Sequence, residues 1–261
     1  AAIADIPDGA TISVESWGIP ACAQNLVAAV KKKGIKDITL VTHNFIPIVL
    51  GEDETCFPSA ILPQLKKLIT PVVGIQQLGA GAFVKEYMEK GLEAELSTHG
   101  TMAARLYAGA ARLGGFYNPV GVGTVIGEGK ETRVIDGVEY IFEKPIHLDY
   151  AFVRAHKADT LGNLVFKGIF RGDQPVMAMA AKITIAEVDE IVEVGELDAE
   201  EIVLPGIFVD RIVRIPKDGI GTHKKQKALI GRLGEIDIAR KMLFRSVCVE
   251  EKPRVEESKG G

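Results

Sequence analysis

The chain has 261 residues, of which 47% are hydrophobic and 25% charged, which is enough for one large or two small globular domains. Its formal charge of −4 at pH 7 gives no general attraction to phosphate backbones, so we do not expect nucleic acid as a partner. The three cysteines lie far apart and no CxxC or Cys/His metal spacing occurs, which indicates reduced thiols, a cytoplasmic protein and no bound metal. Cys56, in the loop-like context "DETCFPS", is the one candidate for a functional thiol.

The ends of the chain and its longest apolar runs bear on location and domain organisation. The segment "AAIADIPDGA" has neither the basic region nor the apolar core of a signal peptide. No run approaches the roughly 18 apolar residues that a membrane span needs, so we expect no membrane association. We found no internal repeat and no Pro-, Gly- or Ser-rich linker, and therefore predict one domain over residues 1–248 and a charged, flexible tail over 249–261.

Strand-like and helix-like segments alternate through the first half of the chain. Predicted strands lie at 10–15, 37–42, 71–77 and 93–98, and predicted helices at 20–34, 58–69, 82–91 and 102–115. Pro20 is placed at a helix start and Gly34 at its stop, whereas Pro63 breaks or kinks the second helix unless it lies in the first turn. This alternation predicts a parallel sheet with helices packed on it.

The second half of the chain is richer in strand patterns. Segments 137–145, 150–158, 162–168 and 177–195 are mostly strand-like, and "TLGN" between two of them predicts a turn joining adjacent strands. The later segment 223–243 shows a partly helical pattern, and its basic run "HKKQK" is typical of a solvated surface. The predicted fold class is therefore α/β: a single open, mainly parallel sheet with flanking helices and a strand-rich second half.

The first candidate site follows the first predicted strand, in "VESWGIPA". A parallel strand there would bring Glu15 and Trp17 to its carboxyl end, where open α/β sheets bind ligands near helix N-termini. An ordinary strand-to-helix turn with a partly packed tryptophan explains the same residues.

The second candidate is "STHGT", between a predicted strand and a helix. Gly100 permits a positive φ or the close approach of a ligand, and Thr98 or Thr101 is suited to cap a helix that begins at Met102. His99 titrates near neutral pH when unperturbed, so it is able to donate a hydrogen bond or exchange a proton. A purely structural histidine in a turn remains the alternative.

The third candidate is the glycine-rich segment "GGFYNPVGVGT". Successive backbone amides around Gly121, Val122, Gly123 and Thr124 could line an anion or a carbonyl oxygen. The segment is not a phosphate-binding P-loop, and the strand-like residues downstream do not fit a dinucleotide-binding GxGxxG before a helix. Nor does the sequence contain GxSxG or HExxH.

Taken together, these segments resemble the alpha subunit of family I CoA-transferases, which include 3-oxoacid and acetate CoA-transferases. The resemblance is most specific in the continuous block "GLEAELSTHGTMAARLYAGAARLGGFYNPVGVGTVIGEGKE". It extends through "YAFVRAHKADTLGNLVF" and "KITIAEVDEIVEVGELDAEEIVLPGIFVDRIV", and so covers nearly the whole chain. It implies the open α/β fold of CoA-transferases and NagB-like proteins.

The resemblance also implies a mechanism and a partner. In this family the beta subunit supplies a glutamate carboxylate that attacks an acyl-CoA thioester, giving an anhydride and then a glutamyl-CoA thioester that an acceptor acid attacks. The expected function is thus transfer of CoA between an acyl-CoA and a carboxylic, possibly 3-oxo, acid, with CoA as a substrate and no permanently bound cofactor. We expect an αβ or α2β2 complex in which this chain supplies part of the site wall: His99 as the oxyanion donor, with Glu15, Trp17, Gly100, Thr101, Gly121, Val122, Gly123 and Thr124 lining the substrate pocket.

This sequence departs from the family pattern at the candidate sites. His99 stands where the resemblance implies a glutamine that donates toward the thioester oxygen, Glu15–Pro20 replaces a longer glycine-rich motif, and "FRGDQP" replaces Arg-Asn-Phe-Asn. A histidine is able either to donate through a ring N–H or to act as a base on water. A CoA-thioester or ring-opening hydrolase of the same architecture is therefore the alternative, and a non-catalytic ligand-binding module is a third hypothesis.

Overall fold

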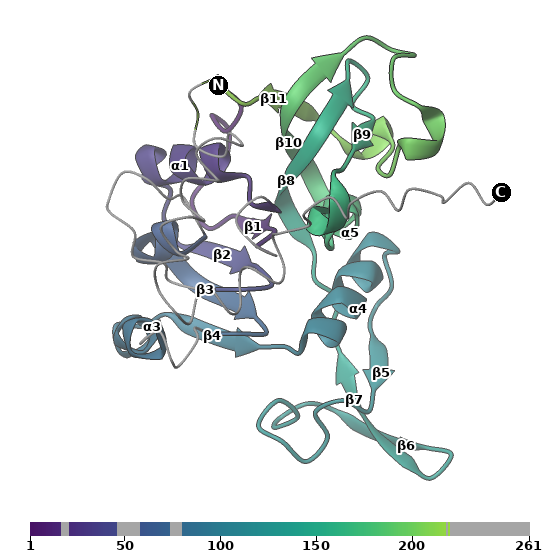
Figure 1. Ribbon diagram of the computed structural model, residues 1–261. Helices are drawn as coiled ribbons and strands as arrows, with labels where there is room; N and C mark the ends of the chain where they lie inside the picture. Colours follow the sequence, from purple (N-terminus) through teal and green to yellow (C-terminus); the bar gives the residue numbers. More distant parts are fainter. Residues whose placement is uncertain (17–20, 46–57, 74–79, 218, 220–261) are drawn as a thin grey trace, which may run out of the picture.

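The computed structural model describes residues 1–16, 21–45, 58–73, 80–217 and 219, and a twisted, mainly parallel sheet runs through its centre (Figure 1). Its strands follow the order β11-β10-β8-β1-β2-β3-β4, and β9 pairs antiparallel with β8. The strands are β1 (Thr11–Val14), β2 (Ile38–Val41), β3 (Leu65–Thr70), β4 (Glu93–Leu96), β8 (Leu148–Asp159), β9 (Leu164–Val165), β10 (Ala181–Val192) and β11 (Arg211–Arg214). The predicted α/β class and the parallel pairing are confirmed.

Helices cover both faces of this sheet. They are α1 (Gln24–Lys33), α3 (Ala80–Glu89), α4 (His99–Ala110) and α5 (Gln174–Met179), with 3₁₀ turns η2 (Pro58–Gln64), η4 (Gly168–Arg171), η5 (Ala199–Glu201) and η6 (Gly206–Phe208). Alternate residues of β8 separate the two apolar layers: Phe152 belongs to the core under α1, η2 and α3, whereas Ala151 and Val153 belong to the core under α4 and α5. Two-sided burial of this kind is what makes parallel strands read as continuous apolar runs.

A second, smaller sheet projects from beneath α4 (Figure 1). It is antiparallel, in the order β5 (Phe116–Asn118), β7 (Val138–Glu143), β6 (Thr132–Ile135). Asp136 and Gly137 connect β6 to β7 with φ values of 52° and 79°. Two consecutive positive φ angles are what a tight two-residue hairpin requires, and Asp-Gly suits them. These strands confirm the strand-rich second half.

Helix ends follow local chemistry. Gly34 ends α1 with φ of 72°, as predicted, but α1 begins at Gln24 and Pro20 lies outside the described residues. Thr98 caps α4, its side chain accepting from the Thr101 N–H at 3.4 Å, so α4 begins at His99, three residues earlier than predicted. His99 is therefore the first residue of a helix and not a turn residue.

The prediction for 58–77 was wrong in part. Only Pro58–Gln64 is helical, as a 3₁₀ turn, and Leu65–Thr70, predicted as the end of that helix, forms β3. Pro63 has no N–H to continue a helix, and short apolar runs read equally well as helix or strand. The strand predicted at 71–77 is described only to Val73, which forms an isolated bridge with Phe45.

The other expectations divide between confirmed and undescribed. In 177–195 the strand β10 is confirmed, but it is preceded by α5, which was not predicted. "TLGN" is confirmed as the β8–β9 turn: Asp159 Oδ1 accepts the backbone N–H groups of Leu161 at 3.1 Å and Asn163 at 2.9 Å, and Gly162 has φ of 94°. Cys56, the 223–243 segment and the predicted tail lie outside the described residues. Among the residues that are described, no helix is long and apolar enough to cross a membrane.

Candidate functional site

Several polar side chains gather at the carboxyl ends of the parallel strands. Glu15 follows β1, His43 follows β2 and His99 lies just beyond β4, so these strands deliver all three residues to one edge of the sheet. Asp173, immediately before α5, joins them from the other half of the chain. We refer to Glu15, His43, His99 and Asp173 as the edge cluster.

The centre of the edge cluster is a pair of stacked imidazoles. The ring centroids of His43 and His99 lie 5.7 Å apart with an angle of 9° between the ring planes. His43 Nε2 is 2.6 Å from Asp173 Oδ2, an ion-pair distance, and the His43 side chain is only 2% exposed. A buried histidine thus lies between a carboxylate and a second histidine.

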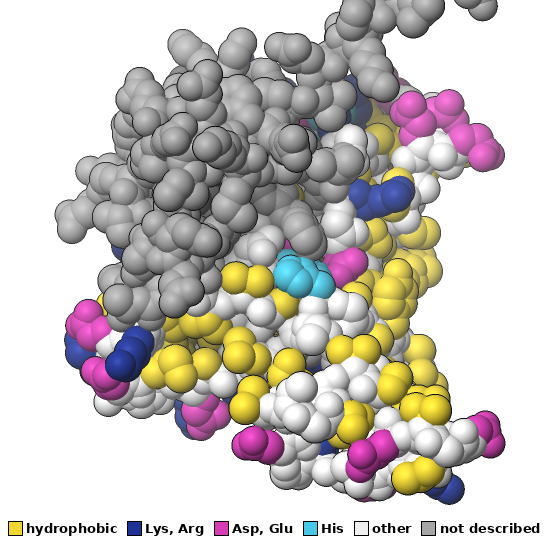
Figure 2. Space-filling model, turned by 60° about the horizontal axis from the view of Figure 1, so that its bottom comes forward, with side chains coloured by type: hydrophobic (Ala, Val, Ile, Leu, Met, Phe, Trp, Pro, Cys, Tyr) yellow, Lys and Arg dark blue, Asp and Glu magenta, His cyan; other side chains and the backbone are white. Residues whose placement is uncertain are grey.

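His99 is the more accessible of the two histidines, since it is half-buried at the start of α4. Partial burial lowers its pKa from the ordinary 6.5, the neighbouring His43 lowers it further, and Asp173 acts in the opposite direction. The ring therefore favours its neutral form at pH 7, with one N–H donor and one acceptor nitrogen. Figure 2 shows a histidine on this face of the molecule with an acidic side chain beside it, among largely uncharged and hydrophobic atoms.

Glu15, predicted to line the substrate pocket, is fully buried. Its Oε1 accepts the Ser16 N–H at 2.7 Å and its Oε2 accepts the Asp173 N–H at 2.9 Å. The carboxylate thus holds the segment before α5 against the end of β1. Its predicted contact with substrate is tested by neither the fold nor the comparisons below, and Trp17 lies outside the described residues.

Gly100 and Thr101 follow His99 in the first turn of α4. Gly100 is exposed and no atom outside its chain neighbours and its own helix lies within 4 Å of a Cβ built on it. Thr101 is buried, and its Oγ1 accepts hydrogen bonds from Thr98 Oγ1 at 2.8 Å and from Asn118 Nδ2 at 2.9 Å. Asn118 ends β5, so this contact ties the start of α4 to the glycine-rich segment that follows.

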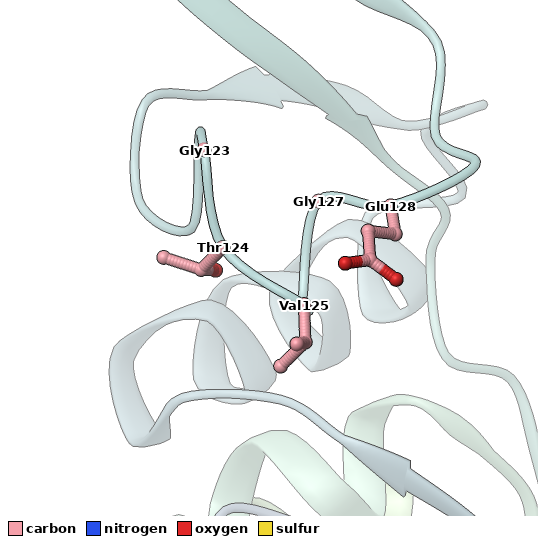
Figure 3. Close-up of a pocket in the computed structure, with 5 residues that line it drawn as sticks. All are labelled: Gly123, Thr124, Val125, Gly127 and Glu128. Carbon is pink, nitrogen blue, oxygen red and sulfur yellow. The ribbon is translucent and has the colours of Figure 1, made fainter.

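The glycine-rich segment forms an open loop beside a hollow. The hollow has a volume of about 600 Å³ and is lined by Gly123, Thr124, Val125, Gly127 and Glu128 (Figure 3). Gly121 and Gly123 have φ values of 95° and 71°, and the Gly121 carbonyl accepts from the Thr124 N–H at 3.1 Å and from its hydroxyl at 2.8 Å. Thr124 therefore closes the loop on itself, while Gly123 remains exposed toward the hollow.

The structure groups the predicted residues into two places. His99, Gly100 and Thr101 lie with Glu15 at the edge of the main sheet, whereas Gly121–124 form the loop beside the hollow, none of whose five lining residues is His99. Val122 is half-buried between the two exposed ends of that loop. Within the described part of the chain, no group of three or more His, Cys, Asp or Glu side chains could hold a metal ion.

Two members of the edge cluster were missed. His43 carries no motif of its own, and Asp173 was noted only as part of the unusual "FRGDQP" segment. A signal for His43 was present, because it follows a predicted parallel strand just as Glu15 and His99 do. Inspection of every strand end, and not only the glycine-rich ones, would have found it.

Comparisons with known proteins agree on one family. The family described as Coenzyme A transferase matches residues 1–214. The chain is 42% identical over 216 residues to the A subunit of succinyl-CoA:3-ketoacid coenzyme A transferase of Helicobacter pylori, covering 82% of this chain and 88% of that protein. It is 37% identical over 215 residues to the A subunit of 3-oxoadipate CoA-transferase of Pseudomonas putida, covering 82% and 90%.

The fold agrees with these relatives. The solved structure of an acyl-CoA transferase from Escherichia coli O157:H7, a thioester complex with CoA, superimposes with a TM-score of 0.71 at 21% identity. The match covers 86% of this chain but only 47% of that longer one. The names of the relatives support transfer and not the hydrolase alternative. From the family match over residues 1–214 and the similarity of its relatives, this chain belongs to the coenzyme A transferase family.

Proposed function

We propose that this chain is the alpha subunit of a two-subunit CoA-transferase, which moves CoA between an acyl-CoA and a carboxylic acid. The relatives are named as one of two kinds of subunit, which supports a second chain in the enzyme, and the succinyl, 3-keto and 3-oxoadipate acids in their names support a short or oxo acid as substrate. The nucleophilic glutamate would come from the beta subunit. CoA is then a substrate that the enzyme binds and releases.

The observation that carries the proposal for this chain is the position of His99. Its ring is half-exposed at the carboxyl edge of the sheet, at the N-terminus of the twelve-residue helix α4. A helix N-terminus favours developing negative charge, and a ring N–H beside it is a suitable donor to an oxyanion. Because the ring favours its neutral form, it donates without bringing a full positive charge next to the partner's carboxylate.

The reaction assigns His99 the same task at each acyl transfer. The partner's carboxylate oxygen attacks the thioester carbon, the carbonyl oxygen becomes an oxyanion that accepts from His99, and the C–S bond breaks to release CoA thiolate. The thiolate attacks the glutamyl carbonyl of the anhydride, releasing the donor acid and leaving the glutamyl-CoA thioester. The acceptor carboxylate then repeats these steps in reverse, and no proton is consumed overall.

The remaining pocket assignments belong to this proposal. Gly100 and the backbone at Gly121–124 would form walls that a thioester approaches closely, because exposed glycines leave room beside the chain. Thr101 would hold the first turn of α4 to Asn118. The cytoplasm, where acyl-CoA and reduced thiols occur together, is the proposed location, to be checked by cell fractionation.

The test is transfer by the assembled enzyme. This chain is produced together with the chain encoded beside it, the complex is purified, and an acyl-CoA with labelled CoA is incubated with and without succinate, acetate or a 3-oxo acid. We expect labelled CoA on the added acid and no turnover when this chain is alone. Release of free CoA that needs no acceptor acid would contradict transfer and restore hydrolysis.

A further inference from the structure

The two residues behind His99 form a unit that the reaction above does not use. His43 is buried at the end of β2, Asp173 approaches it from the start of α5, and the His43 ring lies parallel to the His99 ring. The two histidines belong to separate strand–helix units, so this stack exists only because the sheet is parallel at this edge.

We propose that His43 and Asp173 are positioning residues that fix the plane of the His99 imidazole, so that its ring N–H points at the thioester oxygen. This inference rests on the proposed role of His99 as the donor. It adds a second pair of residues to the site and gives the unusual "FRGDQP" segment a task.

Burial and charge explain how the pair holds the ring. His43 is unable to turn away because its side chain is buried and Nε2 faces the Asp173 carboxylate at 2.6 Å. Offset parallel rings at this centroid distance attract each other, so an immobile His43 ring restricts rotation of the His99 ring. A donor held in one orientation loses less freedom when the oxyanion forms.

Asp173 is itself held in place. Its backbone N–H donates to Glu15 Oε2 at 2.9 Å, and Glu15 is buried at the end of β1. Among the described residues, the charged or titratable groups that face His99 are thus His43 from β2 and Asp173 from the α5 side, with Glu15 behind Asp173. His43 favours the neutral His99 ring and Asp173 favours the protonated one, so the pair sets the balance between the two forms.

The experiment compares His43→Phe, Asp173→Asn and the double variant in the assembled enzyme. Phenylalanine keeps a flat ring but removes Nε2, so we expect kcat to fall about tenfold with a smaller change in KM. The double variant should lose about as much as either single variant, because the two residues act as one unit. The ring-proton titration of His99, followed by NMR, should move to higher pH in His43→Phe, since the opposing imidazole is gone.

His156→Phe is the matched control. His156 Nδ1 lies 3.0 Å from Asp189 Oδ2 on β8 and β10, a second His–Asp pair away from the edge cluster, and its loss should leave kcat within twofold. If His43→Phe does not fold, as judged by circular dichroism, His43→Gln provides the same comparison with a smaller side chain.

The outcomes separate this inference from the proposed function. Wild-type kcat and an unmoved His99 titration in His43→Phe, or losses that multiply in the double variant, would overturn the positioning role. A His99→Ala enzyme with full activity would instead contradict the donor role of His99. The titration comparison would still report whether His43 controls the ring.

Discussion

At the scale of single residues, the donor role of His99 is tested by two substitutions. His99→Ala removes the ring N–H from the N-terminus of α4, and loss of one oxyanion donor costs about 10²–10³ in kcat. His99→Gln keeps an N–H donor of similar reach and should retain most of the transfer. Steady-state transfer rates of the assembled enzyme, with thermal unfolding to confirm that both variants fold, measure the difference.

The glutamine variant separates donation from acid–base chemistry. A glutamine amide does not exchange protons near neutral pH, so abolished activity in His99→Gln would show that His99 acts as an acid or base. Unchanged turnover in His99→Ala would return His99 to a structural role at the start of α4.

Part of the site could be predicted from the sequence because part of it has local causes. Glycine, threonine and histidine between a strand and a helix pointed to the start of α4, and the structure places His99 there. Asp173 had no such cause: its place beside His43 depends on the pairing of β1 with β8, which brings distant halves of the chain together. Long-range pairing of this kind leaves no trace in spacing or composition.

At the scale of elements, Gly109 decides how closely α4 approaches the chain before β8. A Cβ on Gly109 would lie 2.0 Å from the Ile146 carbonyl oxygen, and Ile146 itself donates its N–H to the Arg105 carbonyl at 2.9 Å. Helix propensity alone predicts that Gly109→Ala stabilises by about 1 kcal/mol, but this clash reverses the sign. We expect destabilisation of about 1–3 kcal/mol, measured by urea unfolding.

Gly100→Ala is the control in the same helix. Its added methyl group meets nothing within 4 Å, so the propensity gain should remain and stability should rise or stay unchanged. A Gly109→Ala protein as stable as Gly100→Ala would show that α4 is free to shift away from Ile146.

Glu187 joins the N-terminus of α1 to the centre of the sheet. The side chain is fully buried in β10, and its carboxylate accepts from the Asn25 N–H at 3.0 Å, Asn25 Nδ2 at 2.8 Å and the Leu26 N–H at 3.1 Å. Glu187→Ala leaves these donors without their acceptor and should cost about 1–3 kcal/mol of unfolding free energy. The exposed Glu190, paired with Lys157, is the control, and Glu190→Ala should change stability by less than about 0.5 kcal/mol.

The pH dependence of that difference follows from the pKa of Glu187. Burial raises this pKa above 4.5, although the hydrogen bonds from Asn25 and Leu26 and the charge of Arg154 oppose the shift. A raised folded-state pKa gives a stabilising contribution that is complete below 4.5 and is lost as pH rises through the folded value. The stability difference between wild type and Glu187→Gln should therefore shrink on raising the pH through this window, and a difference that grows would contradict the shift.

The element order was largely predictable, because alternating apolar and polar runs directly reflect burial in a parallel sheet. The exceptions have a common reason. Residues Leu65–Thr70 and Gln174–Met179 are short, and a short apolar run has the same pattern as a buried strand or a single helical turn. Only the neighbouring strands and helices decide between them.

At the scale of the whole molecule, a chain of charges links the two sheets. Lys67 on β3 lies 2.7 Å from Glu95 on β4, and Glu95 is 2.6 Å from Arg105 on α4. Glu143 on β7, almost fully buried, lies 3.9 Å from Arg105 and 2.6 Å from Lys130, which follows the glycine-rich loop. Burial raises the pKa of Glu95, but the contacts with Lys67 and Arg105 outweigh it and lower the pKa overall.

Arg105 is the central member of this chain of charges, and its loss should release the small sheet. The guanidinium is 8% exposed and also donates to the Lys144 carbonyl at 2.8 Å, so Arg105→Met leaves buried Glu143 with Lys130 as its one remaining cation in this chain of charges. Removing one partner of a buried ion pair costs about 3 kcal/mol or more.

We expect this loss to be local as well as global. Amide hydrogen exchange in β5, β6 and β7 should accelerate more than exchange in β1 and β2, because Arg105 is the residue that joins α4 to the end of β7. Lys90→Met, which removes an exposed pair with Glu86 on and beside α3, should leave both the exchange rates and the urea midpoint at their wild-type values. Equal acceleration in both sheets would mean that they unfold as one unit, and the loop beside the hollow would then owe its position to the whole fold and not to Arg105.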